Sequence, residues 1–182
     1  MHKVLTALGI LSAGILQAAE MTITVAGQAN GKIIIDLLEE IAPLHVERIS
    51  RLASDGAYDN VVFHRVIDGF MAQTGDIEFG KAEKDLSKAG YGGSSLPDLP
   101  AEFSDVPYDR GIVGMARSQS PDSANSQFFI MFDAGYFLNG QYTVVGRVVS
   151  GMEVVDAIKR GRGSNGAVIG TPDVMTTVSV TP

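Results

Sequence analysis

Short runs of β-branched and aromatic residues, separated by turn residues, constrain this chain more than any other feature. Such runs fall at residues 21–25, 32–38, 61–66, 70–73, 111–116, 127–132, 143–149 and 174–180. Apolar residues at helical spacing follow Pro43 and recur over residues 151–160. Because strands and helices do not alternate along the chain, the pattern does not indicate a parallel sheet. It predicts a closed antiparallel barrel with helices over its open ends.

Three glycine-bearing segments are predicted to be turns or loops. Asn30-Gly31 is typical of a tight hairpin turn, because both residues accept positive φ. Residues 80–107 are rich in Gly, Ser, Pro and charge, which predicts a long surface loop of the kind that is often functional or mobile. Residues 161–166 match a dinucleotide-binding glycine pattern, but they follow a predicted helix and open none, so we interpret them as a turn.

Composition excludes several classes of function. The 182 residues are 45% hydrophobic, which is enough for one domain with a full core. A net charge of −7 argues against nucleic-acid binding, which needs a clustered basic face. The chain has no cysteine, so it has no disulfide, thiol nucleophile or thiolate metal site. Its few histidines and the lack of a Gly-x-Ser-x-Gly elbow argue against a metal site or a hydrolase, and we expect His64 to be a structural neighbour of Arg65.

Residues 1–19 predict export. Lys3 precedes an apolar run from Val4 to about Ala19, which is too short to span a membrane as a helix. The layout is typical of a secretory signal peptide that is cleaved after Ala18 or Ala19. We therefore expect a protein of the bacterial periplasm or a secreted one, with no stable membrane association after cleavage. The alternative is an uncleaved N-terminal membrane anchor. Residues 20–182 form the predicted functional domain.

The candidate site centres on Arg65, which lies in the segment from Phe63 to Asp76 among large apolar side chains. A permanently charged group beside an apolar surface is costly to bury and rarely arises without a use. Two later segments, 126–130 and 137–140, add further aromatic and amide side chains. One alternative is that Arg65 pairs with Asp68 or Asp76 on the surface and that the aromatic residues are ordinary core.

These residue types suit rotation about the peptide bond that precedes proline. Its barrier of ~18–20 kcal/mol reflects resonance between the amide nitrogen and the carbonyl. Rotation needs no nucleophile, base or metal, only an apolar slot for the ring, a hydrogen-bond donor near the prolyl nitrogen and fixed contacts to the flanking backbone. Arg65 is the candidate donor, because its guanidinium is rigid and stays charged. Gln73 could both orient Arg65 and bind the substrate backbone.

Together, the three segments resemble the cyclophilins, the peptidyl-prolyl cis/trans isomerases. The resemblance implies an eight-stranded barrel capped by two helices, and catalysis of X-Pro rotation in folding or extended polypeptides without cofactor or metal. It implies catalytic roles for Arg65 and Gln73. The matched substrate-binding positions are Phe70, Met71, Ala116, Arg117, Gln127, Phe129, Phe137, Leu138 and Tyr142. Two rival functions are a proline-segment binding module or holdase chaperone with little turnover, and a small-ligand barrel.

The chain departs from the family's pattern at three of these positions, two of them in comparison with animal cyclophilins. Those proteins mostly carry tryptophan where this chain has Phe137 and histidine where it has Tyr142, and many members of the family have asparagine at the position of Arg117. Without the indole N–H of tryptophan we expect cyclosporin to bind weakly, while proline turnover should survive because a phenyl ring still walls the slot. Arg117 is expected to change substrate preference more than chemistry.

Overall fold

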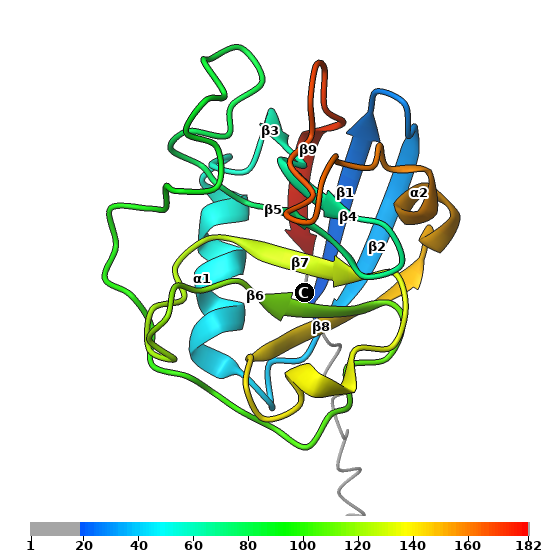
Figure 1. Ribbon diagram of the computed structural model, residues 1–182. Coiled ribbons are helices and arrows are strands. Elements are labelled where there is room, and N and C mark those ends of the chain that lie inside the picture. Colours follow the sequence, from blue (N-terminus) through cyan, green and yellow to red (C-terminus); the bar gives the residue numbers. More distant parts are fainter. Residues whose placement is uncertain (1–18, 182) are drawn as a thin grey trace, which may run out of the picture.

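Nine antiparallel strands form one curled sheet in the computed structural model, which describes residues 19–181 (Figure 1). The expected signal peptide therefore lies almost entirely outside the described residues. The strand order is β3-β9-β1-β2-β8-β6-β7-β5-β4. The strands are β1 (Glu20–Ala26), β2 (Gly31–Leu37), β3 (Val61–Val62), β4 (Arg65–Ile67), β5 (Met71–Thr74), β6 (Ile112–Met115), β7 (Phe128–Met131), β8 (Val144–Ser150) and β9 (Val174–Thr181).

The predicted eight-stranded closed ring is not confirmed, because the run at 61–66 is divided into two strands. β3 pairs with β9 and β4 pairs with β5, so the two strands stand at opposite ends of the ladder. Phe63 and His64 carry the chain from one edge to the other. Within residues 19–181 no ladder joins β3 to β4 directly.

The first hairpin differs from the predicted tight turn. Gly31 is already the first residue of β2 and pairs with Val25, so residues 27–30 make the connection. Asn30 Nδ2 donates to the Gly27 carbonyl at 2.8 Å within it. A Cβ on Gly31 would lie 2.7 Å from Val154 Cγ2. A glycine is thus favoured here for two reasons: its φ is positive, and a helix packs closely against the hairpin.

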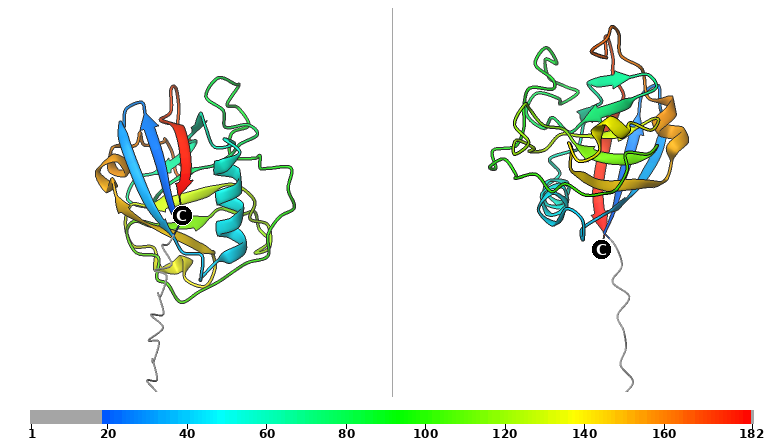
Figure 2. Two further views of the ribbon diagram at one scale, coloured as in Figure 1. Left: turned by 180° about the vertical axis from the view of Figure 1, so that it is seen from behind. Right: turned by 60° about the horizontal axis from the view of Figure 1, so that its bottom comes forward.

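Within residues 19–181, two α-helices lie at opposite sides of the sheet (Figures 1 and 2). α1 (Pro43–Ser54) begins at its proline, as predicted, and buries Val46, Ile49 and Leu52. α2 (Met152–Ala157) is shorter than the predicted 151–160. A 3₁₀ helix, η1 (Tyr136–Leu138), was not predicted. No helix in the described part of the chain is long and apolar enough to cross a membrane.

The sheet separates a main core from a second, smaller apolar cluster. On β7, Phe128 points into the main core, where its ring meets Tyr58 edge-on at 5.6 Å. Its neighbour Phe129 points the opposite way and stacks on Tyr108 at 5.8 Å in the second cluster. This is the alternation expected of a strand, and it means that the second cluster can open to solvent without exposing the main core.

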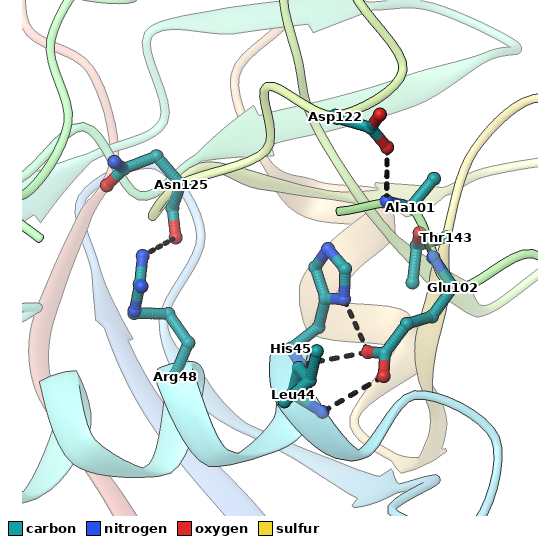
Figure 3. A network of polar contacts seen from close by, with 8 residues as sticks. All are labelled: Leu44, His45, Arg48, Ala101, Glu102, Asp122, Asn125 and Thr143. Atoms are coloured by element: carbon teal, nitrogen blue, oxygen red, sulfur yellow. Dashed lines mark hydrogen bonds and ion pairs between the residues drawn. The ribbon is translucent and has the colours of Figure 1, made fainter. Parts of the chain in front are cut away.

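The long loop, residues 75–111, links β5 to β6 and is anchored on α1 (Figure 3). Glu102 accepts the N–H groups of Leu44 (3.2 Å) and His45 (3.1 Å) in the first turn of α1 and lies 2.6 Å from His45 Nδ1. Arg48 donates to the carbonyl of Pro97 in the loop (2.8 Å), and also to that of Asn125 (3.3 Å), which lies between β6 and β7. As predicted, the loop has no helix or strand of its own, but these contacts hold its course.

Candidate active site

A hollow of about 250 Å³ opens over the second cluster and gathers all of the predicted site positions except Gln127. It lies between β4, β5, β7, η1 and the chain that follows β6. The residues that line it are Arg65, Phe70, Met71, Gln73, Ala116, Arg117, Phe129, Phe137, Leu138 and Tyr142. Gln127 lines an adjoining hollow of about 390 Å³ that shares Gln73, Ala116 and Arg117 with the first. We call the first one the proline hollow, after the ligand that the resemblance implies.

The floor of the proline hollow is apolar and its rim is aromatic. Met71, Phe129 and Leu138 are buried in the second cluster beneath it. Tyr142 meets Phe129 edge-on at 5.9 Å. At the rim Phe137 is 72% exposed and lies 5.5 Å from Phe70, ring centre to ring centre. A small apolar ring could enter here and contact side chains on several sides.

Arg65 reaches the edge of this hollow from β4, directly opposite Gln73 on β5. Its Nη1 donates to Gln73 Oε1 at 2.9 Å and lies 4.0 Å from Met71 Sδ, while its Nε donates to the Asn165 carbonyl at 2.9 Å. Nη2 has no acceptor within residues 19–181. Burial lowers the pKa of Arg65 from its ordinary value, and the group still remains charged near neutral pH.

The alternative in which Arg65 pairs with a surface carboxylate is wrong. Asp68 instead binds Arg160, at 2.8 Å. Asp76 is fully buried and accepts backbone N–H groups. In the described part of the chain no carboxylate oxygen lies within 4.0 Å of the Arg65 guanidinium. Its charge therefore faces the hollow without an acid beside it.

A line of side-chain amides runs from Arg65 into the loop. Gln73 Nε2 donates to Gln127 Oε1 at 2.9 Å. Gln127 Nε2 in turn donates to the carbonyls of Gly90 (3.0 Å) and Gly92 (2.8 Å). Gln127 therefore lies behind Gln73, one step farther from the proline hollow than the resemblance implied.

In the chain after β6, within the described residues 19–181, one main-chain group is already bonded and two are free to bind a peptide. The Ala116 N–H is already bonded to the Gln127 carbonyl at 2.9 Å. The Ala116 carbonyl and the Arg117 N–H have no partner within the described residues. The Arg117 guanidinium lies over the Tyr142 ring at 4.3 Å and donates to the Gln141 carbonyl. Its charge is thus held at the wall between the two hollows.

His64 lies near the Asp76 carboxylate and the Arg65 guanidinium. Burial lowers its pKa to about 4, although the Asp76 carboxylate opposes that shift. The ring is therefore neutral near neutral pH. No group of three or more possible metal ligands occurs in the part of the chain that the structure describes.

Two contributors to the site were not found from the sequence. Asn165 supplies a main-chain carbonyl to Arg65 from within the glycine-rich turn at 161–166. Any residue type has a carbonyl, so no sequence signal marks this contact. Asp76 supports the loop behind Gln127, and its only signal was its place in the Gln-Thr-Gly-Asp segment after Met71.

Comparisons with known proteins show what the chain is similar to. Residues 20–180 match the family model for the cyclophilin type peptidyl-prolyl cis-trans isomerase/CLD. A probable peptidyl-prolyl cis-trans isomerase of Brucella suis is 59% identical over 146 residues, 79% of this chain and 74% of that protein. Peptidyl-prolyl cis-trans isomerase B of Escherichia coli is 37% identical over 138 residues, 71% of this chain and 79% of that protein.

A solved structure extends the likeness to the fold. A cyclophilin type peptidyl-prolyl cis-trans isomerase of Cryptosporidium parvum, crystallised in the presence of the dipeptide Ala-Pro, has a TM-score of 0.74 at 25% identity. The match covers 90% of this chain and 99% of that one. The curled antiparallel sheet and the two helices described above are thus those of a cyclophilin fold.

Proposed function

The chain belongs to the cyclophilin-type peptidyl-prolyl cis-trans isomerases, and from this premise we propose that Arg65 is its catalytic hydrogen-bond donor. The observation that carries the proposal is the position of its guanidinium. It lies at the edge of an apolar hollow without a carboxylate beside it, and one nitrogen has no acceptor in residues 19–181. Gln73 holds Nη1, which leaves Nη2 able to face a ligand.

The donor acts on the electronics of the amide. A hydrogen bond to the prolyl nitrogen holds its lone pair away from the carbonyl, and this stabilises the twisted amide more than the planar one. Lowering the barrier by ~6 kcal/mol accelerates rotation by about four to five orders of magnitude. No proton is transferred and no covalent bond breaks, so Arg65 needs no titrating partner.

We propose that the substrate is an extended or unfolded segment that contains proline. The proline ring would enter the hollow over Met71 and Phe129, and the unpaired Ala116 carbonyl and Arg117 N–H would bind the flanking backbone. The Ala-Pro dipeptide used with the Cryptosporidium relative supports this class of ligand.

Replacing Arg65 tests the catalytic role. We expect Arg65→Ala to lower kcat/KM for an Ala-Pro peptide by about 10²–10³, as removal of a transition-state donor does. Arg65→Lys should recover only part of the loss, because an ammonium lacks the planar fork. The matched control is Arg147→Ala, an exposed arginine on β8. The assays are peptide isomerisation and proline-limited refolding of an unrelated protein.

The same variants separate an enzyme from a binding module. In an enzyme Arg65→Ala loses turnover and largely keeps peptide affinity. A holdase or binding module would show little turnover to begin with and no loss in Arg65→Ala. That second pattern would contradict the catalytic proposal.

We also propose that the sheet closes as a barrel at β3 and β4. Thr74 Oγ1 on β5 donates to the Val62 carbonyl on β3 at 2.9 Å, and this bond supports the closure because it joins β3, at one end of the ladder, to the strand beside β4 at the other end. Slow hydrogen exchange at the amides of residues 61–67 is expected. Exchange there as fast as at the loop tips would contradict it.

Export is proposed for the segment before β1. The apolar run of residues 4–19 supports it, as does a family match that begins at residue 20. We expect the protein in the periplasmic or secreted fraction with a new N-terminus near residue 19 or 20. Mass spectrometry of the purified protein measures that end. An intact N-terminus in the membrane fraction would favour the anchor.

A further inference from the structure

The carboxylate of Asp76, outside the proline hollow, holds residues 90–92. The side-chain amides of the active site depend on this segment. Asp76 follows β5 and is fully buried. Its Oδ1 accepts the N–H groups of Glu78 (3.1 Å) and Phe79 (2.9 Å), and its Oδ2 accepts those of Gly90 (2.7 Å) and Gly92 (3.0 Å). Within residues 19–181 no Lys or Arg nitrogen lies within 4.0 Å of it. Backbone dipoles therefore stabilise this charge.

Gly92 lets the backbone approach the carboxylate closely. A Cβ at this position would lie 2.5 Å from Asp76 Oδ1 and 2.8 Å from Phe79 Cδ2. Both distances are shorter than atoms in proteins tolerate, so any side chain at Gly92 would push the segment away from Asp76. The contact thus depends on the aspartate and on the glycine together.

The carbonyls of the same segment decide how two amides point. Gly90 and Gly92 present carbonyl oxygens, which only accept, so Gln127 must turn its NH₂ group toward them. Its Oε1 then faces Gln73, which must offer its own NH₂ group. That leaves Gln73 Oε1 toward Arg65, where it accepts from Nη1. Flipping either amide would set donor against donor or acceptor against acceptor.

We propose that Asp76 is a positioning residue for the isomerisation. By holding Gly90 and Gly92 it fixes the amides of Gln127 and Gln73, and through them the guanidinium of Arg65. It does not touch the substrate. The proposal rests on the catalytic role assigned to Arg65 above and adds the device that keeps that side chain in place.

The device requires a carboxylate. Asparagine has the same shape as aspartate but only one acceptor oxygen, so in Asp76→Asn an NH₂ group would face one pair of backbone N–H groups. The segment would shift, and the directed acceptor at Gln73 would be lost. A misplaced catalytic group costs up to about a hundredfold in rate.

The test compares three single variants of the full chain. Asp76→Asn removes the carboxylate. Gly92→Ala keeps the carboxylate but moves the segment. Asp173→Asn is the matched control, because Asp173 is also buried and accepts two backbone N–H groups, from Ala29 and Lys159. Two readouts are used: kcat and KM for an Ala-Pro peptide, and the ¹⁵N–¹H signal of Arg65 Nε, identified by its loss in Arg65→Lys.

We expect kcat to fall about ten- to a hundredfold in Asp76→Asn and several-fold in Gly92→Ala, with KM nearly unchanged. The Arg65 Nε signal should broaden or shift in both. Asp173→Asn should lose stability only, with kcat and the Nε signal as in the original protein. If Asp76→Asn does not fold, Gly92→Ala carries the test.

Three results would overturn the proposal. The first is a folded Asp76→Asn, or failing that Gly92→Ala, whose kcat falls no more than that of Asp173→Asn. The second is a loss of kcat with an unchanged Arg65 Nε signal, and the third is an equal loss in Asp173→Asn. Because the Nε signal reports order at Arg65 whether or not that residue is catalytic, failure of the catalytic proposal stays distinguishable from failure of this one.

Discussion

At Arg65 the fold keeps a permanent charge half-buried beside Met71 and Phe129 without an acid to neutralise it. The two acids that follow it in this segment are engaged elsewhere, Asp68 with Arg160 and Asp76 with the backbone. Desolvation makes this arrangement costly, and burial accordingly lowers the pKa of the guanidinium. In return, the site has a hydrogen-bond donor whose charge is not neutralised by an anion. Such a donor can discriminate between a twisted amide and a planar one.

The rate of isomerisation should hardly depend on pH between about pH 6 and 9. Arginine does not titrate in that range, and burial holds the pKa of His64 at about 4, so the ring stays neutral. The measurement is kcat/KM for an Ala-Pro peptide across this range. A bell-shaped profile centred near pH 7 would identify His64 as an acid or base and contradict the mechanism.

Stability, in contrast to rate, should depend on pH through His64. Its folded-state pKa is about 4 against about 6.5 in the unfolded chain, so the unfolded state binds more protons between these values. The contribution is fully present above pH 6.5 and is lost as the pH falls toward 4, by about 3 kcal/mol. Urea unfolding of the original protein and of His64→Gln at pH 7 and pH 4.5 measures it. Equal pH dependence in both would contradict this assignment.

A tryptophan in place of Phe137 should strengthen cyclosporin binding. Phe137 is 72% exposed at the rim of the proline hollow and offers no hydrogen-bond donor. Phe137→Trp restores an indole N–H, and one hydrogen bond corresponds to roughly a tenfold gain in affinity. Titration calorimetry measures the Kd, with Phe137→Leu as control. Equal affinity in the original protein and Phe137→Trp would show that the donor is not what limits binding.

At the scale of elements, α1 anchors the long loop through hydrogen bonds (Figure 3). Glu102 satisfies two N–H groups in the first turn of α1, where the helix itself has no side-chain cap. A carboxylate at this end also interacts favourably with the helix dipole. The cap thus comes from a residue far along the chain and joins α1 to the loop that borders the site.

Removing that cap should destabilise the protein without harming catalysis. We expect Glu102→Ala to lower the free energy of unfolding by about 2 kcal/mol, because two helix N–H groups and His45 lose their partner. Glu39→Ala, which removes an exposed glutamate, is the control. Chemical denaturation measures both variants. A change in Glu102→Ala no larger than in Glu39→Ala would show that the cap contributes nothing.

At the scale of the whole molecule, the two faces of β7 have different roles, one in stability and one in function. Phe128 belongs to the main core and Phe129 to the cluster under the proline hollow. One face of the strand therefore holds the sheet together, while the other shapes the ligand site. Replacing Phe128 and replacing Phe129 should therefore have different effects, although the two residues are adjacent and of the same type.

Phe128→Ala is expected to cost about 3–5 kcal/mol of unfolding free energy and to leave kcat/KM of the folded protein close to normal. Phe129→Ala should cost less stability, because one side of its ring borders the hollow, and should lower kcat/KM tenfold or more through lost contact with proline. Thermal unfolding and peptide isomerisation compare the two. Matching losses of kcat/KM would contradict the division.

Much of the fold could be predicted because its signals are local. The strand runs, the start of α1 at Pro43 and the long loop each follow from a few neighbouring residues, and all are present. The division of 61–66 into β3 and β4 could not be found this way. Val61 and Val62 pair with β9, more than a hundred residues away, whereas Arg65 pairs with β5, fewer than ten residues away. The break between β3 and β4 therefore depends on these partners.

For the site, the sequence by itself determined which chemical groups were available: a permanently charged donor, two amides, and apolar rings in strands that alternate their faces. Tertiary structure alone decided which of them meet. It placed Arg65 beside the Asn165 carbonyl, put Gln127 behind Gln73 and buried Asp76 under the loop. The physical reason is that residue types and their order set local conformation, whereas hydrogen bonds between distant segments depend on how the whole sheet curls.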